Sequence, residues 1–208
     1  MTTRTKPTFR ETMLQAREDA ILDAVNRLLA TKGFELMTVD EVVADVGIAK
    51  ASLYKHFDSK EELAAAAMQR VLATAQSVAA DLQADASLGP LDKLKGVTRW
   101  AMQTQLAGQM PSLPSHNQTL RAALGAHKGY TDSLFGLSEQ LEQWIEGALA
   151  DGSLRSSLPP TLMLYTVFAR ACDPVLGFLR GSLPDAELVE SVLDATFHGL
   201  AHPLKAGS

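Results

Sequence analysis

The chain has 208 residues, of which 46% are hydrophobic and 21% are charged, and its formal net charge is −5. These values fit a globular protein with one large or two small domains, and they exclude an intrinsically disordered chain. The single cysteine, Cys172, excludes an intramolecular disulfide, and no apolar segment follows the basic N-terminus. We therefore predict no signal peptide and a cytoplasmic location.

The N-terminal third begins with a basic segment and a helix. Arg4, Lys6 and Arg10 could form an arm that enters a DNA minor groove, or they could be charges on a terminus without a role. Apolar residues at helical spacing predict a helix over residues 8–32. Gly33 is expected to end this helix, because glycine adopts the left-handed conformation that helix ends favour.

The next segment has the pattern of two short helices joined by a tight turn. Thr38 and Glu41 form a capping box, which predicts that a helix begins there. Gly47 supplies the turn, and a second helix is expected over residues 49–57. Leu53 and Phe57 lie four residues apart on its buried side. This arrangement predicts a helix-turn-helix whose second helix enters the DNA major groove.

The other face of that second helix carries polar side chains that could contact DNA. The candidates are Lys50, Ser52, Tyr54, Lys55 and His56. Lysine and tyrosine can reach phosphates, and side chains near the start of the helix can reach base edges. The alternative is an ordinary helical hairpin with a solvated face, because similar pairs of helices are common in all-helical proteins.

The string LYKHFDSKEEL, from Leu53 to Leu63, resembles the TetR family of transcriptional repressors, and the resemblance covers roughly residues 17–72. It implies an N-terminal DNA-binding domain followed by a variable helical effector domain. It also implies that Thr38 and Lys60 hold phosphates at the starts of their helices and that Tyr54 contacts a phosphate. Ala49 departs from the family pattern, which often has Ser or Thr there, so the second helix lacks a side-chain cap.

The charge is distributed unevenly between the two parts of the chain. Residues 1–60 contain nine Lys or Arg and nine Asp or Glu, whereas residues 61–208 contain ten and fifteen. The N-terminal part is therefore the relatively basic one. We expect modest non-specific attraction to DNA and binding that depends on a correctly shaped interface.

The rest of the chain is predicted to be helical throughout, which makes the fold all-α. Asp58 or Ser59 should cap a long helix that extends to about residue 84. The boundary between the DNA-binding part and the effector-binding part is expected within this helix, near residue 70. Further helices are predicted over residues 91–107, 119–126, 131–150, 161–179 and 184–200. We predict a small three-helix DNA-binding domain over residues 1–60 and a larger effector-binding and dimerisation domain over residues 61–208.

The most apolar segment, residues 161–179, contains Arg170, Asp173 and Pro174. These interruptions argue against a membrane span, and Pro174 is expected to break the helix.

The last two helices are more apolar than the surface of a monomer should be, so we expect them to form a homodimer interface. Alternatively, they pack entirely within one subunit.

An effector pocket needs an apolar lining with a few polar groups that orient the ligand. Each aromatic candidate is also a plausible core residue. The candidates are Trp100, Met110, His116, Phe135, Trp144, Tyr165 and Arg170.

No metal, cofactor or catalytic site is indicated. His198 and His202 have the spacing of a metal pair, but no third ligand lies nearby and chance spacing is favoured. Phosphate loops, nucleophile elbows and paired carboxylates were not found either, so the sequence does not predict an enzyme.

These features together predict a homodimeric repressor that a small apolar or amphipathic effector releases from a palindromic operator in double-stranded DNA. Two alternatives stay open. One is a small-molecule binding protein whose DNA-binding motif has degenerated, and the other is a DNA-binding regulator that a protein partner controls.

Overall fold

The computed structural model describes residues 8–111, 118–154 and 157–201, with side chains to residue 198. Their regular structure is helical, apart from one isolated bridge between Arg180 and Leu183. The predicted all-α fold is confirmed. The segments are α1 Phe9–Leu36, α2 Val39–Val46, α3 Lys50–Leu53, α4 Lys60–Ala84, α5 Pro90–Leu106, α6 Gln118–Ala126, α7 Lys128–Ala150, α8 Pro160–Ala169, the 3-10 turn η1 Arg170–Cys172, α9 Pro174–Leu179 and α10 Asp185–Ala201.

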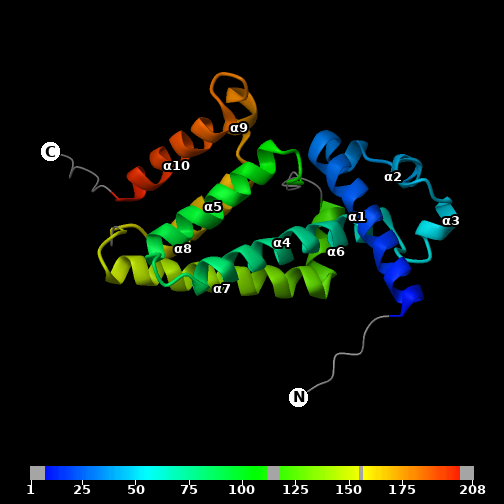
Figure 1. Ribbon diagram of the computed structural model, residues 1–208, viewed down its shortest axis with the longest axis horizontal. Helices are drawn as coiled ribbons and strands as arrows, with labels where there is room; N and C mark the ends of the chain where they lie inside the picture. Colours follow the sequence, from blue (N-terminus) through cyan, green and yellow to red (C-terminus); the bar gives the residue numbers. More distant parts are fainter. Residues whose placement is uncertain (1–7, 112–117, 155–156, 202–208) are drawn as a thin grey trace, which may run out of the picture.

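A small head at one end of the molecule consists of α1, α2, α3 and the start of α4 (Figure 1). Thr8 and Glu11 form a capping box that starts α1. Gly33 has φ 74° and ψ 172°, which kinks α1 before one further turn to Leu36. The predicted first helix is thus confirmed, and Gly33 interrupts it as a kink instead of ending it, because one more helical turn follows to Leu36. The kink turns the chain toward α2, which packs against α1.

The head encloses an apolar core of its own. Ile21 and Val25 of α1, Val42 of α2 and Leu53 of α3 are fully buried there. The core continues along α4 as far as Met68 and also includes Leu120 and Leu124 of α6. The sequence does not indicate this contribution from α6, because it comes from a short helix far along the chain.

The long helix α4 connects the head to the body of the molecule (Figure 1). Ser59 caps it by accepting a hydrogen bond from the Glu62 N–H at 3.0 Å. Its buried residues belong to the head core up to Met68 and to the body core from Ala75 onward. One continuous helix therefore contributes to both cores, and the change from one core to the other falls near its middle.

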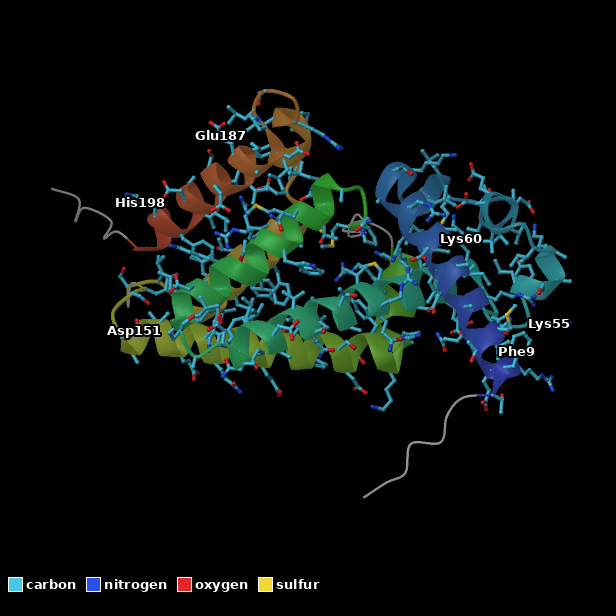
Figure 2. The ribbon with its side chains drawn as sticks, viewed as in Figure 1. Phe9, Lys55, Lys60, Asp151, Glu187 and His198 are labelled. Carbon is cyan, nitrogen blue, oxygen red and sulfur yellow. The ribbon has the colours of Figure 1, made fainter. Side chains whose placement is uncertain are left out.

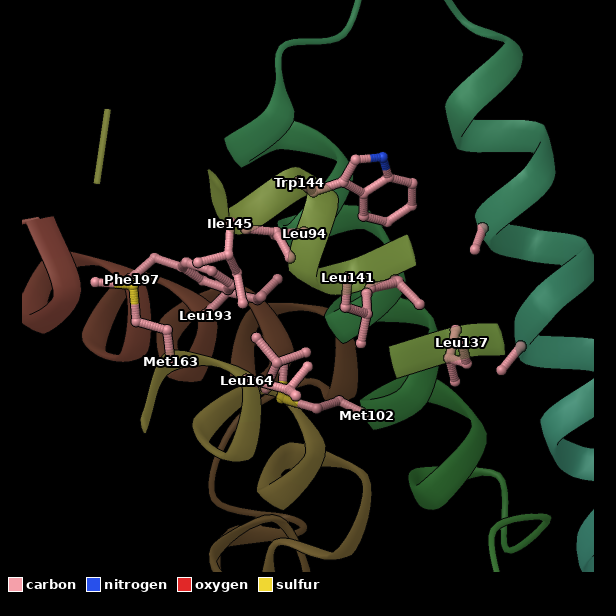
Figure 3. Close-up of a cluster of buried hydrophobic side chains, with 14 of the residues drawn as sticks. Leu94, Met102, Leu137, Leu141, Trp144, Ile145, Met163, Leu164, Leu193 and Phe197 are labelled. Atoms are coloured by element: carbon pink, nitrogen blue, oxygen red, sulfur yellow. The ribbon is translucent and has the colours of Figure 1, made fainter. Parts of the chain in front are cut away.

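The body is a helical bundle around a second apolar core (Figure 3). The largest side chains come from four helices that meet there: α5, α7, α8 and α10. Those labelled in the close-up are Leu94 and Met102 of α5, Leu137, Leu141, Trp144 and Ile145 of α7, Met163 and Leu164 of α8, and Leu193 and Phe197 of α10.

Helix α7 begins three residues earlier than predicted, at Lys128 instead of Thr131. The physical reason is an unexpected cap, because the His127 ring accepts a hydrogen bond from the Tyr130 N–H at 3.1 Å.

The apolar segment after residue 160 is divided into α8, η1 and α9. Asp173 is buried and accepts a hydrogen bond from the Val175 N–H at 3.0 Å, which starts α9 after the break at Pro174. The predicted interruption is confirmed. By length and composition alone, Pro160–Leu179 would pass as a membrane span, and 28% of its most apolar window is buried inside the protein.

Candidate nucleic-acid interface

Local backbone signals build the two-helix motif of the head. The Thr38 hydroxyl accepts a hydrogen bond from the Glu41 N–H at 3.2 Å, and the Glu41 carboxylate accepts one from the Thr38 N–H at 3.1 Å. Gly47 ends α2 in the left-handed conformation, with φ 72° and ψ 37°. Ala49 precedes α3 without a side-chain cap. The structure therefore confirms the predicted capping box, the glycine turn and the absence of a side-chain cap at Ala49.

The second helix of the motif is shorter than predicted. Regular α-helix covers only Lys50–Leu53, and a turn follows over residues 54–56. The difference arises because the N–H groups of Lys55 and His56 bond to carbonyls three residues back, which tightens the chain. Leu53 and Phe57 are nevertheless both buried in the head core, as the sequence predicts.

The predicted DNA-contacting residues of the turn lie at the outer end of the head. Tyr54 and Lys55 are exposed, whereas Ser52 and His56 are half-buried. Figure 2 shows Lys55 at the edge of the head, far from Asp151 and His198 at the opposite end of the molecule. Of these four candidates, Tyr54 and Lys55 are therefore the most accessible to a DNA duplex.

Three other candidates already have partners within the head. The Lys50 ammonium lies 2.9 Å from the Asp40 carboxylate, and their hydrogen bond raises the pKa of Lys50 above its usual value. The Thr38 hydroxyl donates to Glu41 at 3.0 Å. Lys60 donates to the Glu35 carbonyl at 3.4 Å.

Lys60 also lies over the ring of Phe34, with its ammonium 4.4 Å from the ring centroid. This cation–π contact holds the start of α4 against the end of α1. Lys60 would have to keep or exchange these contacts in order to bind a phosphate.

We predict that Asp40→Asn increases DNA affinity. The substitution removes a carboxylate that competes with DNA phosphates for Lys50 and that itself repels DNA. Affinity for any duplex should rise by about two- to fivefold at low salt, because exposed ion pairs are weak competitors. Fluorescence anisotropy with a labelled duplex would measure this change. Asp132→Asn, which breaks the exposed pair with Lys128 in the body, is the matched control. An unchanged affinity of Asp40→Asn would mean that Lys50 does not approach DNA.

The predicted effector-binding residues are not brought together. Phe135 and Tyr165 are each 67% exposed, on α7 and α8 respectively. Trp144 is buried and donates a hydrogen bond to the Gln83 side chain at 2.6 Å. Arg170 is half-buried and lies 2.5 Å from the Asp173 carboxylate.

Two further effector candidates, Met110 and His116, come from the segment after α5. Met110 is half-buried after the end of α5, and His116 is outside the described residues, as is His202 of the histidine pair. Within the described parts of the chain, no group of three or more potential metal ligands was found.

Among the candidates that the structure describes, Trp100 lines an open cleft with a volume of about 730 Å³. Side chains of α1, α4 and the end of α5 form its walls. The residues of this cleft come from three distant segments and share no local pattern, so the sequence does not predict it.

Comparison with known proteins places these features in a family. Residues 21–67 match the family model described as bacterial regulatory proteins, tetR family. An uncharacterised HTH-type transcriptional regulator of Bacillus subtilis, YvaF, is 32% identical over 191 residues, which cover 86% of this chain and 93% of that protein.

Two further proteins are similar to this chain, one in part of the sequence and one in the fold. IcaR of Staphylococcus epidermidis, a negative transcriptional regulator of a biofilm operon, is 44% identical over 46 residues, or 22% of this chain and 25% of that protein. The structure of AibR in complex with isovaleryl coenzyme A and operator DNA superposes with a TM-score of 0.65 at 21% identity, over 87% of this chain and 98% of that one.

Proposed function

This chain belongs to the tetR family of bacterial regulatory proteins, and from that premise we propose that it is a repressor released from its operator by a small-molecule effector. A DNA-binding regulator of transcription follows from the family itself. The observation that carries the rest is the long helix α4, which contributes to both the head core and the body core. A ligand-induced change in the body can therefore reach the head through one rigid element.

For DNA recognition, we propose that the segment from Lys50 to His56 faces the major groove. The exposure of Tyr54 and Lys55 supports contacts with phosphates on both sides of the groove. Thr38 and Lys60 lie at the starts of α2 and α4, where free N–H groups favour anions. We assign Ser52 and His56 to the same surface, with shorter reach because they are half-buried.

Dimerisation would use an exposed apolar face on α8, α9 and the turn before α10. We call this the α8–α10 face, and its exposed apolar side chains are Leu162, Tyr165, Val175, Phe178, Leu179 and Leu183. A groove of about 540 Å³ runs along it between α8 and α10. Apolar area of this kind is unusual on a monomer and supports pairing of two chains through these helices.

Two paired chains would place two heads on a palindromic operator, about one helical turn apart. A ligand that binds better to the conformation with wrongly spaced heads lowers operator affinity. DNA then lowers ligand affinity by the same factor, because the coupling is reciprocal. A complex with both isovaleryl coenzyme A and operator DNA, as in AibR, supports an effector of small apolar or amphipathic chemistry here. We place this regulator in the cytoplasm, where its operator would be.

The experiment that tests the proposal is selection of bound duplexes from a random DNA pool, with and without cell extract. Enrichment of one palindrome would support the DNA-reading function and give the half-site spacing. Loss of binding in the presence of extract, restored by removing small molecules, would support an effector. Failure to enrich any sequence at low salt would contradict the repressor and favour a binding protein with a degenerate motif.

We predict that Lys55→Ala makes operator binding less sensitive to salt. If Lys55 contacts a phosphate, the logarithmic slope of affinity against salt should fall in magnitude by about 1.8, because each of the two subunits makes one phosphate contact fewer, at about 0.9 per contact. The loss of affinity should then be equal for all sequences. Titrations at several salt concentrations would measure the slope. A loss restricted to one operator sequence, with an unchanged slope, would identify a base contact instead.

A further inference from the structure

The open cleft of about 730 Å³ lies where the head meets the body. One wall is the face of α1 that includes Asp23 and Asn26, and the other is the end of α5 with Trp100. Arg70 of α4 lies between them. Because α1 and α5 both pack on α4, any molecule in this cleft would touch the reading head and the body at once.

Arg70 links α4 to α1 beside the cleft, as Lys60 does at the start of α4. Its guanidinium donates one hydrogen bond to the Asp19 carbonyl at 3.1 Å and another to the Asp23 carboxylate. This tie is the one ion pair between α1 and α4 within the described residues. The two acceptors on α1 are thus held by a single side chain that also lines the cleft.

The lining has the chemistry of a site for an anion with a ring. Its charged side chains are Arg27, Arg70 and Asp23, and both arginines have carboxylate partners: Arg27 pairs with Asp45 at 2.5 Å, and Arg70 pairs with Asp23. Trp100 and Val71 supply an apolar surface beside these charges. The Asn26 side-chain oxygen is buried and accepts no hydrogen bond from the described residues, so a rotation of this side chain toward the cleft would let a hydroxyl or amino group of a ligand satisfy it.

We propose that this cleft binds a small aromatic acid that also carries a hydrogen-bond donor. The ligand carboxylate forms a forked pair with Arg70 and takes the place of the Asp23 carboxylate. Its ring lies against Trp100. Because Asp23 belongs to α1 and the ligand does not, the exchange removes the ion pair between α1 and α4 and leaves the hydrogen bond from Arg70 to the Asp19 carbonyl as the remaining link at this point.

This inference deepens the proposed function and rests on it for its consequence. Loss of this ion pair loosens α1 against α4, so the ligand binds better to a conformation of the head that fits the operator less well. Binding of the acid to the cleft itself does not depend on DNA and can be measured alone.

The test uses three probes of equal shape and different charge: 3-hydroxybenzoate, 3-hydroxybenzamide and 3-hydroxybenzamidinium. Each is titrated into the full-length chain by calorimetry. The titrations are repeated by fluorescence in Trp144→Phe, which leaves Trp100 as the only tryptophan. We expect the acid to bind at least about tenfold more tightly than the amide and to change Trp100 emission. Equal or tighter binding of the amidinium, or no binding of any probe, would overturn the proposal.

Two substitutions should act in opposite directions. Arg70→Gln should abolish the preference for the acid, whereas Asp23→Asn should tighten acid binding by about tenfold, because the competing carboxylate is removed. Arg99→Gln is the matched control, since it breaks another ion pair between helices, with Glu190, outside the cleft. An equal effect of Arg99→Gln and Arg70→Gln would contradict a specific site.

Operator binding is measured separately on the same preparations, with the duplex recovered from the random pool. Acid binding without any DNA binding would leave the site intact and contradict the repressor function. DNA binding that none of the probes affects, together with no titration signal, would contradict the site and leave the repressor function standing.

Discussion

Replacing Phe57 with Asp is expected to unfold the head and abolish operator binding. The Phe57 ring is 4% exposed and packs among residues of α1, α2, α3 and α4. Removing a buried aromatic ring typically costs about 3–5 kcal/mol, and a buried carboxylate without a partner adds to that cost. The total approaches the whole stability of a typical domain, roughly 5–15 kcal/mol. Circular dichroism during urea denaturation would show lost helix and an early transition.

Phe57→Leu is the control for this prediction. It removes part of the ring volume without introducing charge, so the head should remain folded and keep most of its DNA affinity. Tyr54→Phe, at an exposed position of the same turn, should leave the urea midpoint unchanged. If Phe57→Asp kept the helix content and midpoint of the parent chain, Phe57 could not be a core residue.

The helix-turn-helix could be predicted from the sequence because its signals are local. Thr38 and Glu41 are three residues apart, and their mutual hydrogen bonds form within one helical turn. Position 47 requires glycine, because its φ is positive and other residues avoid this conformation. Such features depend on neighbours along the chain, and they appear in the structure where the sequence predicts them.

The sites in the body, and at the junction between head and body, depend on packing between segments that are distant in the sequence. No local sequence pattern indicates which of these segments come together. Nothing near Arg70 indicates that Asp23, far earlier in the chain, is its partner. Likewise, Phe135 and Trp144 both follow the apolar pattern of α7, but one faces solvent and the other the core. Composition alone cannot separate a core aromatic from an exposed one, because each helix has several candidate faces.

The α8–α10 face leads to the second large expected effect. Tyr165→Glu combined with Phe178→Glu should convert the dimer to a monomer. Both side chains are exposed in the single chain, at 67% and 86%, so charging them should not unfold it. In the dimer they would be buried, and two desolvated carboxylates on each subunit would oppose association. Analytical ultracentrifugation would follow the mass.

Operator affinity should fall in parallel by about 10²–10⁴-fold, because two linked heads bind far more tightly than one. Affinity for a single half-site should stay the same, which separates lost dimerisation from a damaged head. Phe135→Glu is the matched control, since Phe135 is as exposed as Tyr165 but lies on α7, outside the α8–α10 face. A double variant that remains dimeric would place the interface elsewhere. A monomeric variant with full operator affinity would instead mean that each head reads its half-site independently, and the spacing of the heads could not then transmit the effector signal.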